Sequence, residues 1–359
     1  TYTRGLSVTL TLNATEQMTA YRALRKGILE YEKRQVYRGP EGFVVLPLNS
    51  DDVDTRIAEA LGDHPDNDEI KAAVVLEVSP TRVLASLQSG EDVVISGDGL
   101  KPVASGLADK APVAKQIRRG SIVRVVYENK RWVLTQLPEV EGAFVSMDPR
   151  NGTIRAMVGG FDWRKNKFNH VTQAWRQPGS SFKPFIYSAA LEKGYTGATV
   201  INDAPLFFDA EATGSQPWEP KNYDGKFEGP MSLRTALAKS KNMVSIRVLQ
   251  GVGPKGAQAW ITRFGFEAER HPAYLTMALG AGSVTPLQMA TGYSVFANGG
   301  YRMPPQLIRR ITDDRGRVLV DTPPPEAEEV HRVIDARNAF VMSTLLREVT
   351  RSGTAAKAQ

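Results

Sequence analysis

The first 37 residues carry a pattern of apolar and polar positions that predicts one strand and one helix. Residues 6–12 alternate apolar and polar side chains, as a strand with one buried face does. Asn13 or Thr15 can cap the helix that follows, which extends to Gln35. Apolar residues at helical spacing form its expected buried stripe: Met18, Tyr21, Leu24 and Ile28. Residues 1–37 are therefore predicted as a strand followed by a helix.

Residues 38–140 change character and predict a small β-rich domain. Short β-branched and apolar runs are separated by turn residues, and they lie at 72–78, 82–87, 92–95, 121–127 and 131–136. The last two runs are joined by Glu128-Asn129-Lys130, which predicts a hairpin. Residues 51–61 predict a short helix, and residues 63–68 an acidic loop. Five short strands with one helix favour a barrel of the oligonucleotide/oligosaccharide-binding (OB) type.

Residues 141–359 mix strand and helix patterns. Asn151-Gly152 lies between two alternating runs and is a strong hairpin signal. Residues 307–320 predict a second hairpin, which turns at 314–316. The Pro178-Gly179 break predicts the start of a helix, and helical spacing recurs over 231–239 and 284–296. We expect an α/β (α+β) fold in which helices cover an antiparallel sheet.

Ser180 and Lys183 are the first candidate reactive pair. A serine three residues ahead of a lysine places hydroxyl and amine on one face of a helical turn. The hydroxyl is a poor nucleophile until a base takes its proton, and a lysine is that base only when its pKa is lowered. Chance alone yields about one Ser-x-x-Lys in a chain of this composition, so the pair by itself carries little weight.

Ser240 and Asn242 form the second candidate element, within the chain's one Ser-x-Asn triplet. The triplet follows the predicted helix over 231–239, where a hydroxyl and an amide can relay a proton and hold a lysine. An ordinary helix C-cap is an equally simple interpretation of the triplet alone. The order of the two elements matches the serine-lysine pattern of penicillin-binding proteins and class A β-lactamases.

Longer stretches resemble the transpeptidase domain of class A (bifunctional) penicillin-binding proteins, of the Gram-negative 1A type. They are residues 142–160 (GAFVSMDPRNGTIRAMVGG), 176–190 (RQPGSSFKPFIYSAA), 218–222 (WEPKN), 278–290 (ALGAGSVTPLQMA) and 296–301 (FANGGY). The resemblance implies the penicillin-binding/β-lactamase-like transpeptidase fold over residues 141–359. It also implies that residues 38–140 are an inserted OB-like domain. Residues 1–37 would be a linker strand and helix that pack on the transpeptidase domain.

The resemblance implies a role for each of the four residues. Ser180 would attack the carbonyl of a D-Ala-D-Ala stem peptide, and Lys183 would accept its proton. Ser240 would relay a proton to the leaving D-alanine, while Asn242 would orient Lys183 and the substrate amide. The implied activity is that of a serine-type D-Ala-D-Ala transpeptidase or carboxypeptidase in peptidoglycan synthesis, which β-lactams block covalently on Ser180.

The family also has parts for which this sequence shows no matching motif. A Lys-Thr/Ser-Gly strand supplies the cation that binds the substrate carboxylate, and the nearest candidate here is Arg351-Ser352-Gly353-Thr354. We do not accept it, because a Gly-Thr-Ala segment like residues 353–355 ends a helix ahead of that strand in the family. We therefore expect the domain to stop short of the strand. The glycosyltransferase domain and the N-terminal inner-membrane anchor of this periplasmic enzyme class are also expected outside this chain.

Composition narrows the choice of function only slightly. The 359 residues carry a net charge of +6 without a long basic run, and they include no cysteine. No apolar run approaches a membrane span, and the scattered histidines predict no metal site or other cofactor. The OB-like insert lacks the aromatic residues on a basic groove that nucleic acids require. The resemblance implies instead that an outer-membrane lipoprotein activator docks there, and a rigid spacer is the alternative.

Two other functions stay open at this point. One is a β-lactam-binding or sensor module that is acylated without turnover. The other is a serine β-lactamase, which in class A needs a glutamate after the Ser-x-Asn element. Glu219 superficially resembles that glutamate but precedes Ser240, so the order of motifs disfavours a lactamase.

Overall fold

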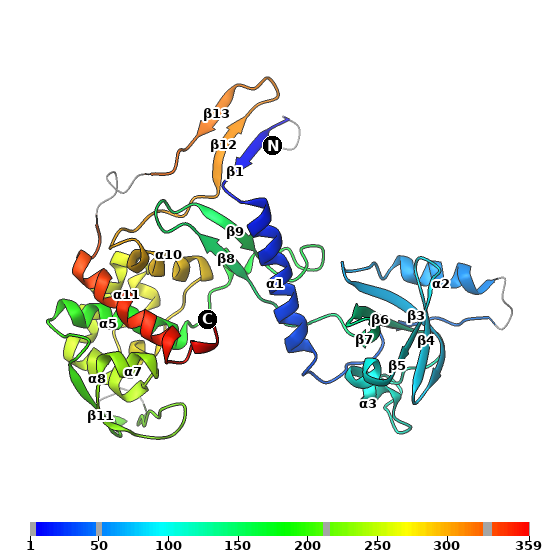
Figure 1. Ribbon diagram of the computed structural model, residues 1–359, viewed down its shortest axis with the longest axis horizontal. Coiled ribbons are helices and arrows are strands. Elements are labelled where there is room, and N and C mark those ends of the chain that lie inside the picture. Colours follow the sequence, from blue (N-terminus) through cyan, green and yellow to red (C-terminus); the bar gives the residue numbers. More distant parts are fainter. Residues whose placement is uncertain (1–4, 48–51, 211–215, 326–331, 359) are drawn as a thin grey trace. The chain divides into compact units, whose positions relative to one another are not determined.

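The computed structural model describes residues 5–47, 52–210, 216–325 and 332–358. The chain divides into two compact units (Figure 1). The first unit comprises residues 1–21, 143–160 and 168–359, and the second comprises residues 22–142 and 161–167. Each unit has hydrophobic clusters of its own. None of the described helices combines the length and apolar character needed to cross a bilayer.

The second unit contains an antiparallel six-stranded sheet. Its strands are β2 (Gly42–Phe43), β3 (Ile70–Ser79), β4 (Arg82–Leu87), β5 (Asp92–Ser96), β6 (Ser121–Glu128) and β7 (Arg131–Thr135). They pair in the order β2-β6-β3-β4-β5, and β7 pairs with β6. All five predicted strands are thereby confirmed, and β2 is the strand that sequence reasoning missed. Helices α2 (Val53–Gly62), η2 (Gly97–Val103) and α3 (Ala104–Leu107) complete this unit.

The barrel expected for this unit does not close among the described residues. No ladder joins β5, at one end of the pairing order, to β7, which pairs with β6 near the other end. Helix η2 follows β5 directly and packs on β7. Gly99 of this helix lies so near the Trp132 carbonyl that a Cβ there would be 2.3 Å from its oxygen. The η2 backbone therefore occupies space beside β7 that a closing strand would need.

Helix α1 (Ala14–Glu32) belongs to the first unit up to Tyr21 and to the second unit beyond it. Asn13 caps it, since its side chain accepts a hydrogen bond from the Glu16 N–H at 3.1 Å. The predicted apolar stripe is wrong at Met18, which is 47% exposed. In that half of the helix the contact is polar, because Gln17 exchanges two hydrogen bonds with the Met157 backbone.

The described part of the first unit contains three small antiparallel sheets. One pairs β8 (Phe144–Met147) with β9 (Ile154–Val158), which confirms the hairpin predicted at Asn151-Gly152. The second has the order β1-β12-β13, from Ser7–Leu10, Ile308–Thr312 and Val318–Asp321. The β12–β13 hairpin confirms a prediction, but β1 is exposed along its length rather than half-buried. The third sheet pairs β10 (Val200–Asp203) with β11 (Gly229–Ser232).

Helices are more abundant than strands in the described part of the first unit. They are α4 (His170–Gln173), η3 (Gly179–Phe182), α5 (Lys183–Glu192), α7 (Leu233–Ala238), α8 (Asn242–Val252), α9 (Pro254–Ile261), η4 (Thr262–Phe264), η5 (Ala268–Arg270), η6 (Leu275–Leu279), α10 (Pro286–Ala297), α11 (Ala336–Arg351) and η8 (Ala356–Ala358). Helix α5 lies at the centre of the helical core, and eight of its residues, Lys183 to Ala190, are buried. A helix that is buried on all sides makes a rigid support for groups at its start.

Candidate active site

A short 3₁₀ turn, η3, presents Ser180 at the surface. Ser180 is exposed, whereas Phe182 two residues later is fully buried. The Phe182 ring packs against Phe185 and Phe266, with ring centroids 5.3 and 5.1 Å away, and stacks on His271 at 4.7 Å. Burying one phenylalanine contributes about 1.5–3 kcal/mol, so this ring anchors the turn that carries the exposed hydroxyl.

Backbone contacts fix the same turn from two further sides. The Tyr293 hydroxyl of α10 donates to the Ser181 carbonyl at 2.7 Å, and the Ser181 hydroxyl donates to the Pro178 carbonyl at 2.6 Å. Gly280 approaches Gly179 so closely that a Cβ on Gly280 would lie 2.1 Å from the Gly179 oxygen. Gly280 also has φ of +71°, which favours glycine. The turn that carries Ser180 is therefore held by the Tyr293 side chain on one flank and by the Gly280 main chain on the other.

Lys183 is the first residue of α5 and has no exposed surface. Its backbone N–H donates to the Ser180 carbonyl, which closes the 3₁₀ turn. Residues three apart are eclipsed in such a turn, so the Ser180 and Lys183 side chains leave the same face. The local spacing predicted from the sequence is thus the one that the turn produces.

The Lys183 amine has three hydrogen-bond partners among the described residues, and none carries a formal charge. It contacts the Ser240 carbonyl at 2.8 Å, the Ser240 hydroxyl at 3.0 Å and the Asn242 Oδ1 at 2.7 Å. Burial lowers the pKa of Lys183 to about 7, because the charged form loses its hydration without gaining a carboxylate. A hydroxyl can donate as well as accept, so these contacts serve both the ammonium and the neutral amine.

Ser240 adopts a backbone conformation that glycine usually supplies. It follows the end of α7 with φ of +55°. Its N–H donates to the Leu237 carbonyl, and the Lys241 N–H donates to the Ala236 carbonyl. This pair of bonds is the Schellman motif, in which the left-handed residue costs about 1–2 kcal/mol when it carries a side chain. The hydroxyl that reaches Lys183 is therefore held in a strained position.

Asn242 is the first residue of α8, and its amide bridges two elements. Its Oδ1 accepts from the Lys183 amine, while its Nδ2 donates to the Lys221 carbonyl at 2.8 Å. The backbone N–H of Asn242 donates to the Asn222 Oδ1 at 2.8 Å. The segment around Asn222 thus holds both the main chain and the side chain of Asn242.

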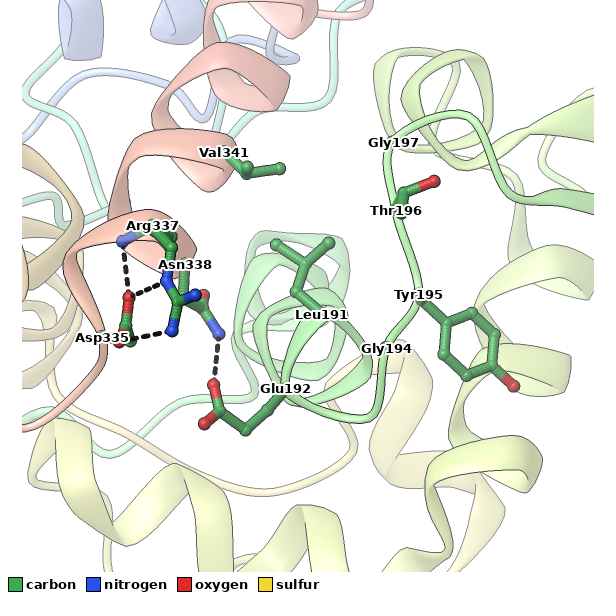
Figure 2. Close-up of a pocket in the computed structure, with 10 residues that line it drawn as sticks. All are labelled: Leu191, Glu192, Gly194, Tyr195, Thr196, Gly197, Asp335, Arg337, Asn338 and Val341. Atoms are coloured by element: carbon green, nitrogen blue, oxygen red, sulfur yellow. Dashed lines mark hydrogen bonds and ion pairs between the residues drawn. The ribbon is translucent and has the colours of Figure 1, made fainter.

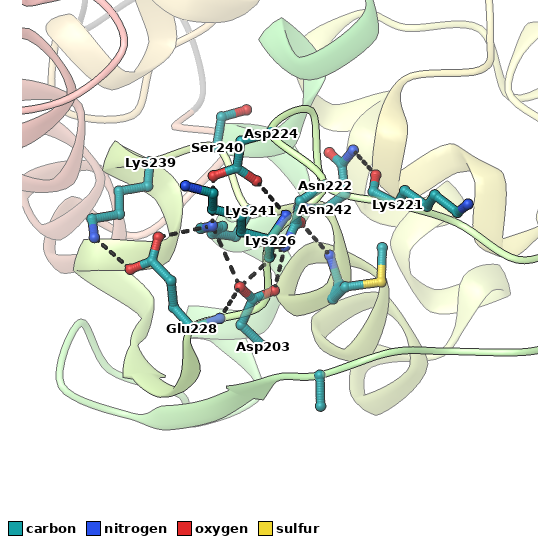
Figure 3. Close-up of polar contacts among 12 residues, drawn as sticks. Asp203, Lys221, Asn222, Asp224, Lys226, Glu228, Lys239, Ser240, Lys241 and Asn242 are labelled. Atoms are coloured by element: carbon teal, nitrogen blue, oxygen red, sulfur yellow. Dashed lines mark hydrogen bonds and ion pairs between the residues drawn. The ribbon is translucent and has the colours of Figure 1, made fainter.

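A second buried lysine lies between Ser240 and Asn242 in the sequence, but it has a different environment (Figure 3). The Lys241 amine is paired with Glu228 at 2.8 Å, Asp224 at 3.3 Å and Asp203 at 3.5 Å. Burial opposes its charge, but the hydrogen bonds to Glu228 and Asp224 and the charge of Asp203 outweigh it, so the pKa of Lys241 is raised. Asp203 is also fully buried.

Comparison with known protein families identifies the family of this chain. Residues 142–359 match the penicillin-binding protein transpeptidase domain, and residues 37–140 match the penicillin-binding protein OB-like domain. The chain belongs to the penicillin-binding protein transpeptidase family. The resemblance found from the motifs is confirmed, together with the fold that it implied.

Relatives within this family are similar along almost the whole chain. Penicillin-binding protein 1A of Neisseria flavescens is 43% identical over 99% of this chain and 44% of that protein. The protein of the same name from Pseudomonas aeruginosa is 35% identical, over 99% of this chain and 49% of its own length. The crystal structure of Haemophilus influenzae penicillin-binding protein 1A superposes with a TM-score of 0.88 at 31% identity, over 98% of this chain and 56% of that one. The chain spans about half the length of the curated relatives that it matches.

This fold also contains a pocket and a groove that are not lined by any of the four candidate site residues. Figure 2 shows a pocket of about 380 Å³ between the end of α5 and the start of α11, where Asn338 donates to Glu192 and Arg337 pairs with Asp335. A groove of about 700 Å³ is lined by β8, α10 and α11. Neither contains Ser180, Lys183, Ser240 or Asn242. Among the described residues, no group of three or more acidic or histidine side chains could hold a metal ion.

The structure brings Lys183, Ser240 and Asn242 into direct contact and places Ser180 on the adjoining turn. Sequence reasoning missed Asp203, and it treated Asn222 only as part of a motif and Lys241 only as the middle of a triplet. No pattern in the sequence marked Asp203, because its burial and its partners Asn222 and Lys241 depend on the folded structure. Arg351, which we rejected as the carboxylate-binding residue, is exposed at the end of α11.

Proposed function

We propose that this chain is the D,D-transpeptidase part of a penicillin-binding protein that cross-links peptidoglycan stem peptides. The observation that carries the proposal is the Lys183 amine. It is buried, its hydrogen-bond partners in the described structure are uncharged, and it follows the exposed Ser180 by one turn. An amine whose pKa is near 7 is half neutral at neutral pH and can accept the proton of a nearby hydroxyl.

Acylation uses the four residues in sequence. The Ser180 Oγ attacks the carbonyl carbon between the two D-alanines, and its proton moves to the Lys183 Nζ. The C–N bond then breaks, and the leaving D-alanine amine takes up a proton relayed through the Ser240 hydroxyl. The products are free D-alanine and an ester on Ser180. Asn242 holds Lys183 in place and offers its amide to the peptide substrate.

Deacylation returns the enzyme to its starting state. The amine of a second stem peptide attacks the ester carbonyl, gives up a proton to Lys183, and displaces Ser180 as a hydroxyl. The new amide is the cross-link. Water in place of the amine would give the carboxypeptidase reaction. A β-lactam takes the first step in the same way, but its leaving nitrogen stays tethered and the ester persists.

The substrate carboxylate needs a cationic side chain to bind it, and none of the motifs found in these 359 residues supplies one. The sequence contains no Lys-Thr-Gly or Lys-Ser-Gly triplet. We propose that a strand of this type, outside the 359 residues, completes the site in the whole protein. Acylation of Ser180 is therefore the step that we assign to this chain.

We further propose a periplasmic location, with an inner-membrane anchor and a glycosyltransferase domain in other parts of the protein. The match to 1A-type relatives along 99% of the chain supports this proposal. Docking of an outer-membrane lipoprotein activator on the OB-like residues 37–140 is proposed on the same grounds. Addition of the purified activator should raise the rate of cross-linking by the whole protein. An unchanged rate would favour the spacer alternative.

Mass spectrometry after incubation with benzylpenicillin tests the proposed acylation. We expect one covalent adduct, located on Ser180 and absent in Ser180→Ala. No adduct, or an adduct on another serine, would refute the assignment. Steady-state hydrolysis of a chromogenic cephalosporin would instead identify a β-lactamase. We expect none, because Glu219 precedes Ser240. Labelling without cross-linking of lipid-linked substrate by the whole protein would identify a sensor module.

A further inference from the structure

Asn222 takes the place of a helix cap for α8. The first backbone N–H groups of a helix have no partner within it, and a side chain at the N-cap usually accepts from them. Lys241 stands at the N-cap of α8 but makes no such bond. Asn222, from the loop before β11, supplies the acceptor, and its Oδ1 lies 2.8 Å from the Asn242 N–H and 3.4 Å from the Met243 N–H. The start of α8 is therefore held from outside the helix.

Asp203 determines which way the Asn222 amide points. Its carboxylate can only accept, and it accepts from the Asn222 Nδ2 at 2.8 and 3.1 Å. The Lys226 carbonyl, also an acceptor, lies 2.7 Å from the same nitrogen. The opposite end of the amide faces two backbone donors of α8. Reversing the amide would oppose acceptors to acceptors and donors to donors, so one orientation is strongly favoured.

Lys221, the residue before Asn222, fixes the orientation of the Asn242 amide in the same way. The Lys221 carbonyl accepts from the Asn242 Nδ2, which leaves the Asn242 Oδ1 facing the Lys183 amine. Lys221 and Asn222 are consecutive, so whatever fixes Asn222 also places the Lys221 carbonyl. In the interior, the Asp203 carboxylate pairs with the Lys241 amine at 3.5 Å and accepts a hydrogen bond from the Glu228 N–H at 3.0 Å. This buried carboxylate is thus linked to the Asn242 amide through the Asn222 side chain and the Lys221 carbonyl.

We propose that Asp203 and Asn222 are positioning residues for acylation, which act by fixing the Asn242 amide against Lys183. This inference rests on the proposed function, since it concerns the same reaction. Neither residue contacts Ser180 or Lys183 directly in the described structure. Their effect is on the rate constant of the chemical step rather than on substrate binding.

Two variants break the link at different points. Asn222→Ala removes the outside cap and releases the Lys221 carbonyl. Asp203→Asn keeps the shape but introduces an NH₂ group. The oxygen of the new amide is expected to face the donors on Lys241 and Glu228, so the new NH₂ faces the Asn222 NH₂ and forces the Asn222 amide to turn. Lys239→Ala is the matched control, because Lys239 is half exposed and pairs with Glu228 at the edge of the cluster.

Labelling with a fluorescent penicillin gives two separate readouts. The final amplitude reports the fraction of folded, competent protein, and the time course at saturating reagent reports the acylation rate constant. We expect full amplitude with acylation slowed about tenfold to a hundredfold in Asn222→Ala and about tenfold in Asp203→Asn, as for a misplaced reacting group. The Lys239→Ala control should match the unaltered chain in both.

The possible outcomes separate this inference from the proposed function. Absence of labelling on Ser180 in the unaltered chain would refute the proposed function itself. Normal labelling there with an unchanged rate constant in both variants would overturn only the positioning role. A lower amplitude with an unchanged rate constant in the labelled fraction would assign the cluster to folding alone and overturn it as well. Should Asn222→Ala fail to fold, Asp203→Asn decides between these outcomes.

Discussion

The two buried lysines of the active-site region have opposite electrostatic environments. Lys183 is fully buried among a carbonyl, a hydroxyl and an amide, and burial lowers its pKa to about 7. Lys241 is 3% exposed and lies among three carboxylates, which raise its pKa despite the burial. Both residues are lysines, and they are buried to nearly the same degree. The directions of their pKa shifts differ because the partners of Lys241 are charged and those of Lys183 are not.

The contrast shows two different uses of a buried lysine amine, one suited to proton transfer and one suited to neutralising buried acids. A buried amine without a counter-charge is poised to gain and lose a proton. A buried amine with counter-charges keeps its proton and neutralises acids in the interior instead. Lys241 and Asn242 are consecutive, yet Lys241 pairs with three carboxylates and Asn242 contacts Lys183, the proposed base. A single turn of chain therefore joins the two kinds of site.

Replacing Lys183 by methionine should have the largest effect on chemistry. The side-chain volume is kept while the base is lost, so acylation by benzylpenicillin should fall by about 10²–10⁴-fold. The melting temperature should change little, because the lost amine carried a burial cost of its own. Stopped-flow labelling and thermal unfolding together measure both effects. Retention of fast acylation would remove Lys183 from the role of base.

The same substitution at Lys241 should instead act on stability. Lys241→Met leaves the fully buried Asp203 without its cation, and breaking a buried pair in this way costs about 3–5 kcal/mol. We expect a large fall in melting temperature, measured by circular dichroism. Asp224→Asn is its control, because half-exposed Asp224 is one of three partners and its loss should matter little. Equal stability of Lys241→Met and the unaltered chain would contradict the contrast.

The pH dependence of acylation should report Lys183 alone. The rate constant should rise about tenfold per pH unit below 7 and level off above it, because only the neutral amine accepts a proton. The folded-state pKa lies below the unfolded value of 10.5, so the unfolded chain binds more protons in between. The free energy of unfolding from this group should therefore rise with pH from about 7 to 10.5. A rate independent of pH between about 5 and 8 would contradict this assignment.

Ser240→Gly should have a small effect on stability, opposite in sign to that of Lys241→Met. Glycine adopts φ of +55° without strain, so the melting temperature should rise by an amount that corresponds to about 1 kcal/mol. Acylation should slow, because the hydroxyl that contacts Lys183 is lost. Ser240→Ala separates the two effects, since it removes the hydroxyl and keeps the strain. A fall in stability for the glycine variant would show that no strain is stored there.

Local patterns were sufficient to predict most of the secondary structure. The short β-rich run at residues 82–87 matched β4, and Asn151-Gly152 marked the β8–β9 hairpin, because both signals depend on neighbouring residues. The prediction that Met18 is buried failed because this half of α1 makes polar contacts with β9, through Gln17 and the Met157 backbone. Local sequence patterns also could not predict whether the barrel closes, because closure depends on where the η2 segment packs against β7.

The four candidate residues came from motif spacing and family resemblance, and their catalytic roles remain predictions. The contacts among Lys183, Ser240 and Asn242 could not be derived from composition. The Asp203–Asn222–Lys241 cluster was not predicted, because it links strand, loop and helix across long sequence separations. The lowered pKa of Lys183 likewise depends on burial that only the assembled core provides.

The approach of Gly280 to Gly179 has a consequence for antibiotic resistance. Main chain faces main chain there, at φ of +71° and with no room for a methyl group. We therefore expect that no point substitution at Gly280 is tolerated, so selection cannot reshape this flank of the proposed nucleophile by that route. A library of all amino acids at this position, sorted for penicillin labelling, should return glycine alone. An inhibitor that hydrogen-bonds to this backbone would meet a surface that single codon changes cannot readily alter.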